Sequence, residues 1–407
     1  MIKYNFLLYL LSPYLIFKVI YCAFRRKSGA LFILERLGLK KIKNNRENIW
    51  IHAASLGETK IAIILYKKLS QTDKNLNFLI TTTTSSSYEL IKSLEGNITH
   101  CYMPIDWFFT TKDFIKRVRP LICILIETEI WPNLIKQCKK VKIPTTIVNA
   151  RLSKKTTGAS TLVKNIYHEV LPDISKIYCK TNEEESNYIK LGADPKKINV
   201  LGNLKLIPQE NSSDYENIIG KKYVLAASTH RGEERQIITE WLKMKERKIL
   251  LVIVPRHPER LGDILSDIPL DMVDISIRSK EEPITNRTQI YIADTYGELD
   301  GLMKYCEFVF MGGSLVDHGG QNFIEAANQG KTIIVGPYMY NFISETEEFL
   351  QNNSMIMVKS SESLKHVFEK LIKSRQRREL FGNNAKKLIL SKSDIIDKYC
   401  QSILSMI

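Results

Sequence analysis

The feature that most constrains the fold is the alternation, after residue 45, of short apolar runs with amphipathic stretches. Such alternation is typical of parallel β-strands that helices cover on both faces. We therefore predict an α/β fold with helices over Glu58–Ser70, Tyr88–Leu94, Asn322–Gln329 and Ser361–Ile372. The predicted strands are Ile49–Ala53, Phe78–Thr82, Cys101–Met103, Leu121–Glu127, Thr145–Val148, Lys176–Cys179, Tyr223–Ala227, Ile249–Val254, Gln289–Ala293, Phe308–Met311 and Thr332–Val335.

The polar stretch 208–222 divides this pattern and is predicted to be a linker. We expect an N-terminal segment 1–27, a doubly wound domain 28–207, a second one 223–380, and a helical tail 381–407 that crosses back to the first domain. Ligands of such sheets bind beyond the carboxyl ends of the strands. The functional site is therefore expected in a cleft between the two halves, on loops that follow strands.

The chain is basic, with 59 Lys and Arg against 44 Asp and Glu and a formal net charge of +15. The charge is spread along the sequence, so it fits a solvated lysine-rich surface as well as a field for anionic partners. Zinc spacings, RNP-like strands and basic zippers do not occur, and nucleic acid is not an expected partner. Seven widely spaced cysteines without Cys-x-x-Cys indicate reduced thiols of a cytosolic compartment.

The N-terminal run 5–24 is apolar and about long enough to span a bilayer. Three cations at 25–27 follow it, and the positive-inside bias then places the rest of the chain on the cytoplasmic side. Lys18 and Pro13 weaken the span, so an interfacial helix and a helix buried in the first domain stay open. Attachment to membrane lipid through residues 5–24 is the prediction.

The first predicted strand ends in HAASLGE, His52 to Glu58, where a helix begins. Ser55 and Gly57 suit a tight turn, since glycine allows positive φ and close approach of a ligand. Glu58 lies at the helix start on the cleft side. Ser55 and Glu58 also have the spacing of a capping box, which would explain them without a ligand.

The fourth strand ends in IETEIWPN, which places Glu127 and Glu129 at its end beside Trp131. Carboxylates in that position rarely serve the core. The alternative is that one of them pairs with a neighbouring arginine such as Arg151. The aromatic stretch Trp107–Phe109 is expected to be buried in the core, although contact with acyl chains is the other interpretation.

Four loops of the second half carry Gly, Ser, Thr, His or Arg at strand ends, and together they suit a nucleotide. Arg256 can contact a phosphate with its guanidinium fork. Gly319 and Gly320 precede a predicted helix start, and Asn322 and Glu325 share one helix face from which they could bind two ribose hydroxyls. The four loops are AASTHRGEE (226–234), VPRHPER (254–260), ADTYGEL (293–299) and MGGSLVDHGGQNFIEAA (311–327).

No Asp-x-Asp occurs, whereas a nucleotide-sugar enzyme that uses Mg²⁺ would usually need clustered carboxylates. We therefore predict no metal and no cofactor. Cationic side chains and helix dipoles would then have to stabilise the leaving phosphate.

Taken in order, these motifs resemble the 3-deoxy-D-manno-octulosonic acid (Kdo) transferases of lipopolysaccharide synthesis over residues 45–345. The resemblance implies a GT-B fold and an inverting, metal-independent transferase at the inner membrane. The donor would be CMP-Kdo and the acceptor the tetra-acylated lipid A precursor. The motifs that carry it are HAASLGE, IETEIWPN, NARLS, LGNLK (Leu201–Lys205), VPRH, DTYGEL, MGGSL and GGQNFIEA.

The resemblance also implies residue roles. Glu58 would be the catalytic base, with Ser55, Gly57, Glu127 and Glu129 around the substrates in an acceptor-binding domain 28–207. One departure is that the family commonly has His-Asn-Pro after the Gly pair, where this chain has Gln321, Asn322 and Phe323. The expected CMP contacts in domain 223–380 are Pro255, Arg256, Tyr296, Gly297, Glu298, Gly312, Gly313, Ser314, Asn322, Phe323, Ile324 and Glu325.

Two rival functions remain at this point. Another GT-B transferase or a sugar-nucleotide epimerase would use a similar pair of domains. A non-catalytic protein of the membrane surface would bind anionic lipid through its net charge, but it would leave the Glu58 turn and the Asn322–Glu325 pair unexplained.

Overall fold

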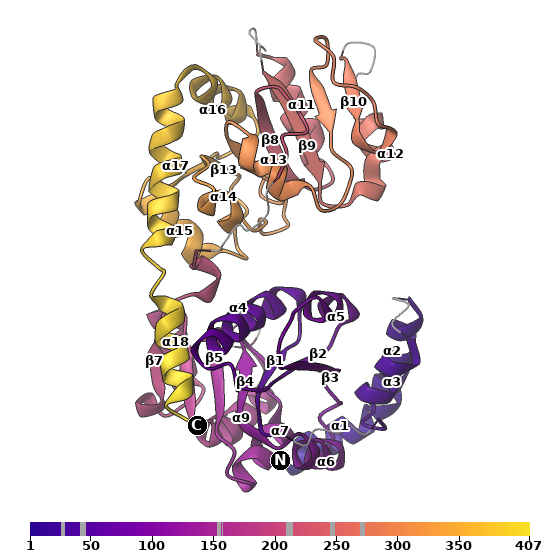
Figure 1. Cartoon of the computed structure of the whole chain (residues 1–407), viewed down its shortest axis with the longest axis vertical. Coiled ribbons are helices and arrows are strands. Elements are labelled where there is room, and N and C mark those ends of the chain that lie inside the picture. The colour runs from indigo at the N-terminus through magenta and orange to yellow at the C-terminus, as the bar shows by residue number, and fades with distance from the viewer. Residues whose placement is uncertain are drawn as a thin grey trace. The chain divides into compact units, whose positions relative to one another are not determined.

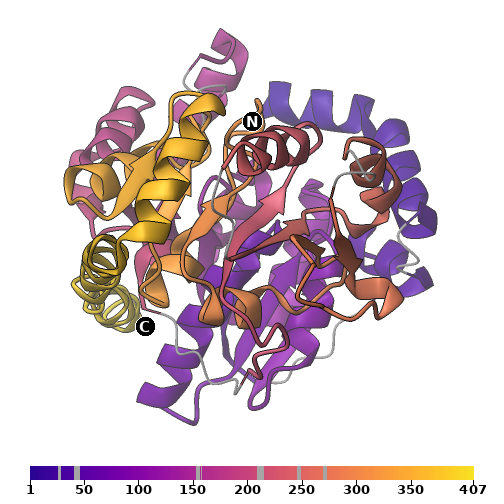
Figure 2. The ribbon, with the colours of Figure 1, turned by 90° about the horizontal axis from the view of Figure 1, so that it is seen from above.

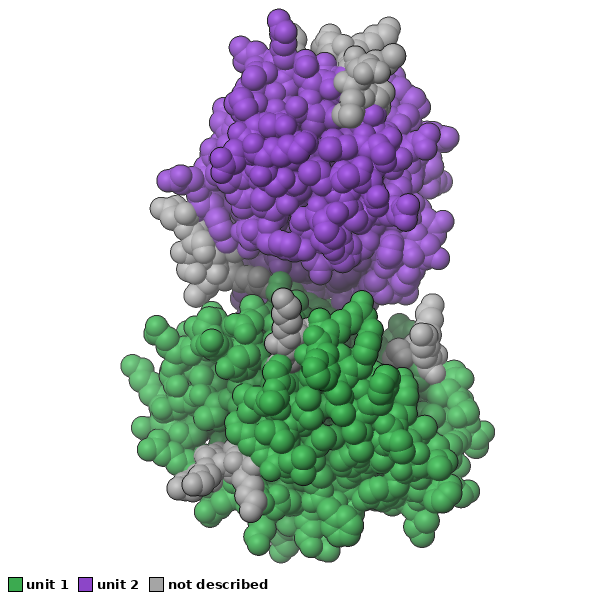
Figure 3. Space-filling model, turned by 90° about the vertical axis from the view of Figure 1, so that its right-hand side faces the viewer, with its two compact units in different colours: residues 1–205, 394–407 green, residues 206–393 purple. Residues whose placement is uncertain are grey.

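The computed structural model describes residues 1–25, 29–40, 46–152, 156, 158–208, 215–244, 249–268 and 273–407. The chain forms two compact units (Figure 3): unit 1 comprises residues 1–205 and 394–407, and unit 2 comprises residues 206–393. The C-terminal tail is divided between them. Helix α17 (Arg375–Leu390) belongs to unit 2, and α18 (Ile395–Leu404) packs on α4 (Leu56–Thr72) of unit 1.

Unit 1 contains a seven-stranded parallel sheet in the order β3-β2-β1-β4-β5-β6-β7, with helices on both faces (Figure 1). Strands β1, β2 and β5 are buried along their whole length, as strands between two helical layers should be. The strands are β1 Asn48–Ala53, β2 Phe78–Thr82, β3 Ile98–Tyr102, β4 Pro120–Ile126, β5 Thr145–Ala150, β6 Lys176–Cys179 and β7 Ile198–Val200. The other helices are α1 Ile2–Leu10, α2 Ser12–Arg25, α3 Gly29–Arg36, α5 Ser85–Lys92, α6 Phe108–Val118, α7 Pro132–Lys140, α9 Thr161–Val170 and α10 Asn182–Lys190.

Unit 2 repeats this plan with a parallel sheet in the order β10-β11-β9-β8-β12-β13-β14, seen from above in Figure 2. Alternate residues of β8 enter two different apolar clusters, because successive side chains of a strand point to opposite faces. The strands are β8 Tyr223–Thr229, β9 Leu250–Pro255, β10 Ile275–Ile277, β11 Ile290–Ile292, β12 Val309–Met311, β13 Ile333–Val335 and β14 Met355–Met357. The remaining helices are α11 Glu233–Leu242, α12 Leu261–Ser266, α13 Leu299–Tyr305, α14 Ile324–Asn328, α15 Ile343–Gln351 and α16 Glu362–Lys373.

The structure confirms all eleven predicted strands and the predicted doubly wound α/β architecture. Strands β7, β10 and β14 were not predicted. Each has three residues and lies at an edge of its sheet, where one neighbour and partial exposure leave little apolar pattern. The helix predicted over Asn322–Gln329 is shorter and begins at Ile324, because Phe323 is its N-cap.

The N-terminal segment forms two helices, α1 and α2, that meet at a bend of 54°. Among the described residues no single helix has the length and apolarity to cross a membrane, although this bent pair meets both criteria together. Val19 and Ala23 of α2 pack against Phe32 and Tyr102 of unit 1. Other apolar side chains of the segment point outward, and Phe6 and Phe24 are 70% and 78% exposed.

Gly312 allows two loops of unit 2 to approach more closely than any residue with a side chain would permit. A Cβ atom built on Gly312 would lie 2.3 Å from the carbonyl oxygen of Ser228. We therefore expect Gly312→Ala to lower the stability of unit 2 by about 3 kcal/mol, since backbone atoms would have to move. Thermal unfolding of the purified protein measures this.

The matched control is Gly262→Ala in α12, where a Cβ atom meets nothing within 4 Å. Alanine favours a helix over glycine by about 1 kcal/mol, so this variant should be as stable as the native chain or slightly more so. Equal melting temperatures for the two variants would refute the steric argument.

Candidate functional site

The predicted site residues gather where the strand order of each sheet reverses. In unit 1 this point lies between β1 and β4, and in unit 2 between β8 and β12. Open α/β sheets bind ligands outside the carboxyl ends of the strands at this reversal. The Glu58 turn follows β1 and the Glu127–Glu129 loop follows β4, so both lie at the reversal in unit 1.

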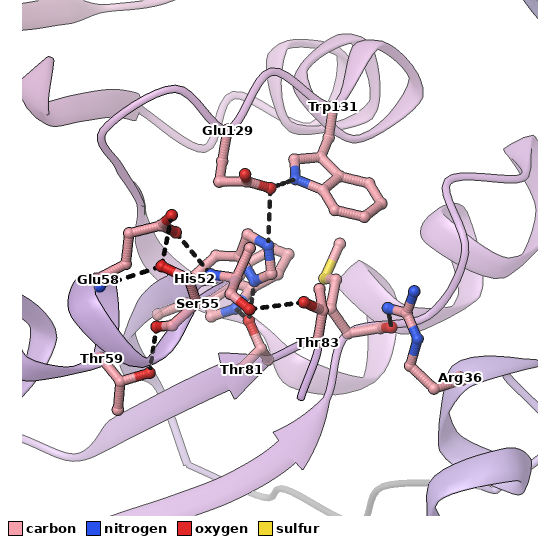
Figure 4. A network of polar contacts seen from close by, with 12 residues as sticks. Arg36, His52, Ser55, Glu58, Thr59, Thr81, Thr83, Glu129 and Trp131 are labelled. Carbon is pink, nitrogen blue, oxygen red and sulfur yellow. Dashed lines mark hydrogen bonds and ion pairs between the residues drawn. The ribbon is translucent and has the colours of Figure 1, made fainter. Parts of the chain in front are cut away.

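Glu58 is held in the first turn of α4 by a capping box. The hydroxyl of Ser55 accepts a hydrogen bond from the Glu58 amide at 3.3 Å and donates to its carboxylate at 2.9 Å. The other carboxylate oxygen accepts from the amide of Ala54 at 2.7 Å (Figure 4). The capping alternative is thus confirmed. Because a carboxylate has about four lone-pair positions and two are used, Glu58 keeps acceptor capacity.

The expectation for Gly57 was wrong in one respect. This residue lies inside α4 and is absent from the described residues with positive φ. The strand-to-helix turn is made by Ser55 in extended conformation, so Gly57 is not needed for an unusual backbone angle. Gly57 is exposed, and a Cβ atom there would meet only the Ser55 hydroxyl, at 4.0 Å.

Glu58 has an unusually basic carboxylate. Burial and the negative charge of Glu129 together raise its pKa to about 7, although the hydrogen bonds from Ala54 and Ser55 oppose the shift. A group with this pKa is partly ionised near neutral pH. It can therefore accept a proton more readily than an ordinary glutamate.

Glu129 is positioned by the side chains of Trp131 and His52 (Figure 4). Its carboxylate accepts from the indole of Trp131 at 2.9 Å, and the Nε2 atom of the buried His52 lies 3.7 Å away. His52 Nδ1 contacts the Thr81 hydroxyl at 2.8 Å, and that hydroxyl accepts from Trp50 at 2.9 Å. The Thr81 hydroxyl can then donate its own proton to Nδ1, an arrangement in which a neutral imidazole carries its proton on the Nε2 atom facing Glu129.

Burial alone would raise the pKa of Glu129, but His52, Trp131 and Arg36 together lower it. The two carboxyl groups at this end of the sheet therefore differ in pKa: Glu129 stays ionised, whereas the pKa of Glu58 is shifted toward neutral pH. Such a pair of opposite shifts is a recurrent sign of acid–base sites.

Glu127 has a different environment from Glu129. Its carboxylate is buried between Arg151, with Nε at 3.2 Å, and Lys205, with Nζ at 2.5 Å. The alternative that one of the two glutamates pairs with Arg151 is thus confirmed for Glu127. The residue also has a φ of 60°, which turns the chain sharply after β4. The motifs that contain Arg151 and Lys205 are thereby joined in one ion-pair network.

In unit 2 a single buried carboxylate organises two loops. Glu233 accepts hydrogen bonds from the backbone amides of His230, Gly313, Ser314 and Leu315 at 2.6–2.9 Å. It thereby fixes the loop after β12 against the loop after β8. The sequence analysis did not single out Glu233, because a Glu-Glu pair at a helix start looks like ordinary N-terminal capping.

Three imidazoles gather at the carboxyl ends of β8, β9 and β12. The rings of His230 and His318 stack with centroids 4.1 Å apart, and His257 meets His230 edge-on at 6.1 Å. The amide nitrogen of Gln321 lies 2.9 Å from His230 Nε2. Burial lowers the pKa of His230 to about 4, and its positive neighbours, including Arg256, contribute. His230 is therefore neutral near pH 7, and the positive charge of Arg256 beside it makes this end of the sheet suited to an anion.

The predicted CMP contacts with exposed or half-exposed side chains differ in whether another residue of the chain already binds them. Arg256 is exposed and forms no ion pair with another described residue. Tyr296 is 75% exposed. Glu298 instead forms an ion pair with Arg278 at 2.6 Å, which lowers the pKa of its carboxyl.

Other CMP candidates are buried and act through their backbone or through support of the loops. Pro255, Gly312, Gly313 and Ser314 are all buried. The Ser314 hydroxyl accepts from the amide of Gly336 at 2.8 Å and also donates within the loop. Its side chain therefore joins two loops and does not face a ligand.

The residues of the segment Asn322–Glu325 likewise differ in burial. Phe323 and Ile324 belong to the apolar core of unit 2. Asn322 and Glu325 are half-buried, and the Asn322 amide donates to the Glu325 carboxylate at 3.3 Å. Asn322 precedes the N-cap of α14, so the two residues do not share a helix face as predicted, but their side chains are in contact. Within the described residues, no group of three or more His, Cys, Asp and Glu side chains could hold a metal ion.

Known proteins are similar to this chain in sequence and in fold. Residues 33–207 match the profile of the family described as 3-deoxy-D-manno-octulosonic-acid transferase (kdotransferase). The chain is 32% identical to the 3-deoxy-D-manno-octulosonic acid transferase of Haemophilus influenzae over 86% of this chain and 85% of that protein. The transferase of Rickettsia bellii is 30% identical, with 98% of both chains covered.

A solved glycosyltransferase from Rickettsia africae has a TM-score of 0.62 to this structure at 13% identity, covering 88% of this chain and 98% of that one. That likeness concerns the fold, which is GT-B. The sequence relationship over nearly the full length is more specific. This chain is therefore a glycosyltransferase that belongs to the 3-deoxy-D-manno-octulosonic acid transferase family.

Proposed function

We propose that this chain transfers Kdo from CMP-Kdo to the tetra-acylated lipid A precursor in lipopolysaccharide biosynthesis, with inversion and without a metal ion. The observation that carries this proposal is the buried Glu58 carboxylate at the end of β1, with its pKa raised to about 7. Its turn is the first motif of the resemblance to the family. A sugar hydroxyl is a poor nucleophile and needs a base of this kind.

In this mechanism Glu58 removes the acceptor proton as the hydroxyl oxygen attacks the anomeric carbon of Kdo. The bond from that carbon to the phosphate oxygen breaks on the opposite face, and CMP leaves with the electron pair. Glu129 keeps the Glu58 carboxylate basic through its own negative charge, since the structure holds it ionised. Glu127 is neutralised by Arg151 and Lys205 and would shape the surface around the base.

The loops of unit 2 would bind the donor. Arg256 offers a cationic guanidinium, and the imidazoles of His230, His257 and His318 offer hydrogen bonds, for the phosphate and for the carboxylate of Kdo. Asn322 and Glu325 would bind the ribose hydroxyls. These groups would stabilise the leaving phosphate without a metal ion.

The acceptor carries acyl chains, so the enzyme would act at the cytoplasmic face of the inner membrane. The proposed attachment is the N-terminal helix pair, whose outward side chains include Phe6, Leu10, Phe17 and Phe24. Its polar contacts with unit 1 support a helix pair lying in the interface. Tyr4 donates to Asp106 at 2.8 Å.

The decisive test is product mass. Incubation of the detergent-solubilised protein with CMP-Kdo and the lipid A precursor, in the presence of a chelator, should add one or more Kdo units and release CMP. An intact donor and acceptor after long incubation would refute the function. Conversion of the donor alone into an isomer would favour an epimerase.

Glu58→Gln should lower kcat by about 10²–10⁴-fold, because the amide cannot take the proton. Binding of CMP, measured by calorimetry, should not change. The matched control is Glu89→Gln, an exposed glutamate on α5 that should keep full activity. A Glu58 variant with native turnover would eliminate this residue as the base.

Glu129→Gln should move the pH profile of kcat. The negative charge of Glu129 contributes to the raised pKa of Glu58, so its removal should lower that pKa. Glu58 would then be ionised at lower pH, and the acid limb of the profile should shift toward acid. Rates measured from pH 5 to 9 test this, and a limb that stays in place would show that burial alone sets the pKa.

Arg256→Ala should weaken CMP-Kdo binding by roughly 10–100-fold, the usual effect of losing a hydrogen bond to a charged group. The control is Arg235→Ala on α11, where the arginine is also exposed. Donor affinity that falls equally in both variants would indicate a general charge effect and contradict a specific contact.

A further inference from the structure

Unit 1 has a second candidate site between helices α6 and α7, which pack side by side. A cavity of about 310 Å³ opens between their C-terminal halves, which is at the lower end of the size of small-molecule sites. Its lining has an apolar floor and a basic rim. The floor is Ile115, Val141 and Ile143, with the aliphatic part of Gln137, and the rim is Lys112, Lys116, Arg119 and Lys140.

The rim cations have no counter-charge. Across the described ranges, none of the four forms an ion pair, and all four are exposed. The two acidic groups close by are already engaged, Asp113 with Arg117 at 2.6 Å and Asp173 with Lys136 at 2.7 Å. Four cations around one apolar hollow repel each other, so an anionic ligand would bind there favourably.

The basic rim continues into an apolar surface. Phe109, Lys112, Lys116 and Arg119 follow one stripe of α6, since residues three and four apart share a helix face. Phe109 is 73% exposed, so the expectation of a buried Trp107–Phe109 stretch was wrong for this residue. At this end of α6 the Trp107 indole donates to Ser12 of α2 at 2.9 Å, next to the exposed side chains of the N-terminal helices.

From this placement we infer that the α6–α7 cavity binds an anionic phospholipid of the membrane, with an acyl chain on the apolar floor and the phosphate on the rim lysines. An inorganic anion would gain nothing from the floor. The exposed Phe109 and the basic stripe beside it, which lead to the N-terminal helices, suit an anionic lipid surface. Each lysine near an anionic bilayer contributes about 1 kcal/mol, which is about fivefold in binding.

This site is separate from the proposed catalytic residues. Helix α6 runs from the carboxyl end of β3 to the start of β4. Its last turn therefore lies at the amino-terminal ends of the strands, whereas Glu58 lies at the carboxyl-terminal ends. Substitutions at the rim should therefore leave transfer to a detergent-solubilised acceptor unchanged. The inference consequently stands or falls independently of the proposed function.

The test is vesicle flotation of the full chain with the triple variant Lys112→Gln, Lys116→Gln, Lys140→Gln. The measured quantity is the ratio of affinities for vesicles that contain phosphatidylglycerol and for pure phosphatidylcholine, which cancels the apolar contribution of the N-terminal helices; comparison with the native chain cancels the contribution of their cations. For three lost charges this ratio should fall by about a hundredfold at low salt. The matched control replaces Lys67, Lys74 and Lys190, exposed lysines elsewhere on unit 1, by glutamine and should keep the ratio within severalfold of native.

Entry of the acyl chain needs its own readout. Val141→Trp should gain fluorescence that phospholipids brominated along the chain quench, and Val200→Trp, on the edge strand β7, should not. An unchanged ratio in the triple variant overturns the inference and leaves an acidic protein segment as the occupant. An equal fall in the control, or quenching that does not differ between the two tryptophans, overturns it as well.

Discussion

The structure depends on burying parallel strands on both faces. Strand β1 has no exposed residue, and the same holds for β9. Strands of this kind cannot carry polar side chains along their length, because each would need a partner inside the core. Polar groups are therefore confined to the strand ends. The turns after β1, β4, β8 and β12 bring them together where the strand order reverses.

The carboxyl-terminal ends of the two sheets have opposite electrostatic character. In unit 1 the site residues are carboxylates, and two of them are controlled by different means. Glu127 is neutralised by Arg151 and Lys205, whereas Glu129 stays charged beside His52. In unit 2 the carboxyl-terminal end of the sheet carries imidazoles and Arg256, and the acidic Glu233 is buried and accepts hydrogen bonds from backbone amides. This division matches a base in one unit and an anionic donor in the other.

Most of the architecture could be predicted from the sequence because central strands have a strong signal. The run Leu121–Ile126 is apolar throughout, and the structure buries it within β4. The edge strand β14 gives a weaker signal, since its apolar run Met355–Met357 has only three residues. Site residues at strand ends were also predictable in position. Their partners were not, because Glu233 contacts Gly313 across 80 positions of the chain and only the folded structure brings the two together.

The capping box at Glu58 shows why a structural and a catalytic interpretation do not exclude each other. The box fixes the carboxylate with two hydrogen bonds, which by themselves would lower its pKa. Burial and the charge of Glu129 outweigh them. A freely rotating glutamate could relieve the repulsion by turning to solvent, but one held by Ser55 and Ala54 cannot. The cap therefore maintains the raised pKa that a base requires.

The N-terminal helices are connected to this site through buried groups at the start of α7, of which Asp106 makes the most contacts. Asp106 accepts hydrogen bonds from the amides of Asn133 and Leu134 at the start of α7, and Tyr4 of α1 donates to the same carboxylate. Trp131, the N-cap of α7, holds Glu129. Burial raises the pKa of Asp106 to about 7, so loss of the Tyr4 contact would remove one of the hydrogen bonds that keep it charged. A displacement of α1 by its surroundings would therefore act on the helix start that positions Glu129, and hydropathy along the segment gives no sign of this connection.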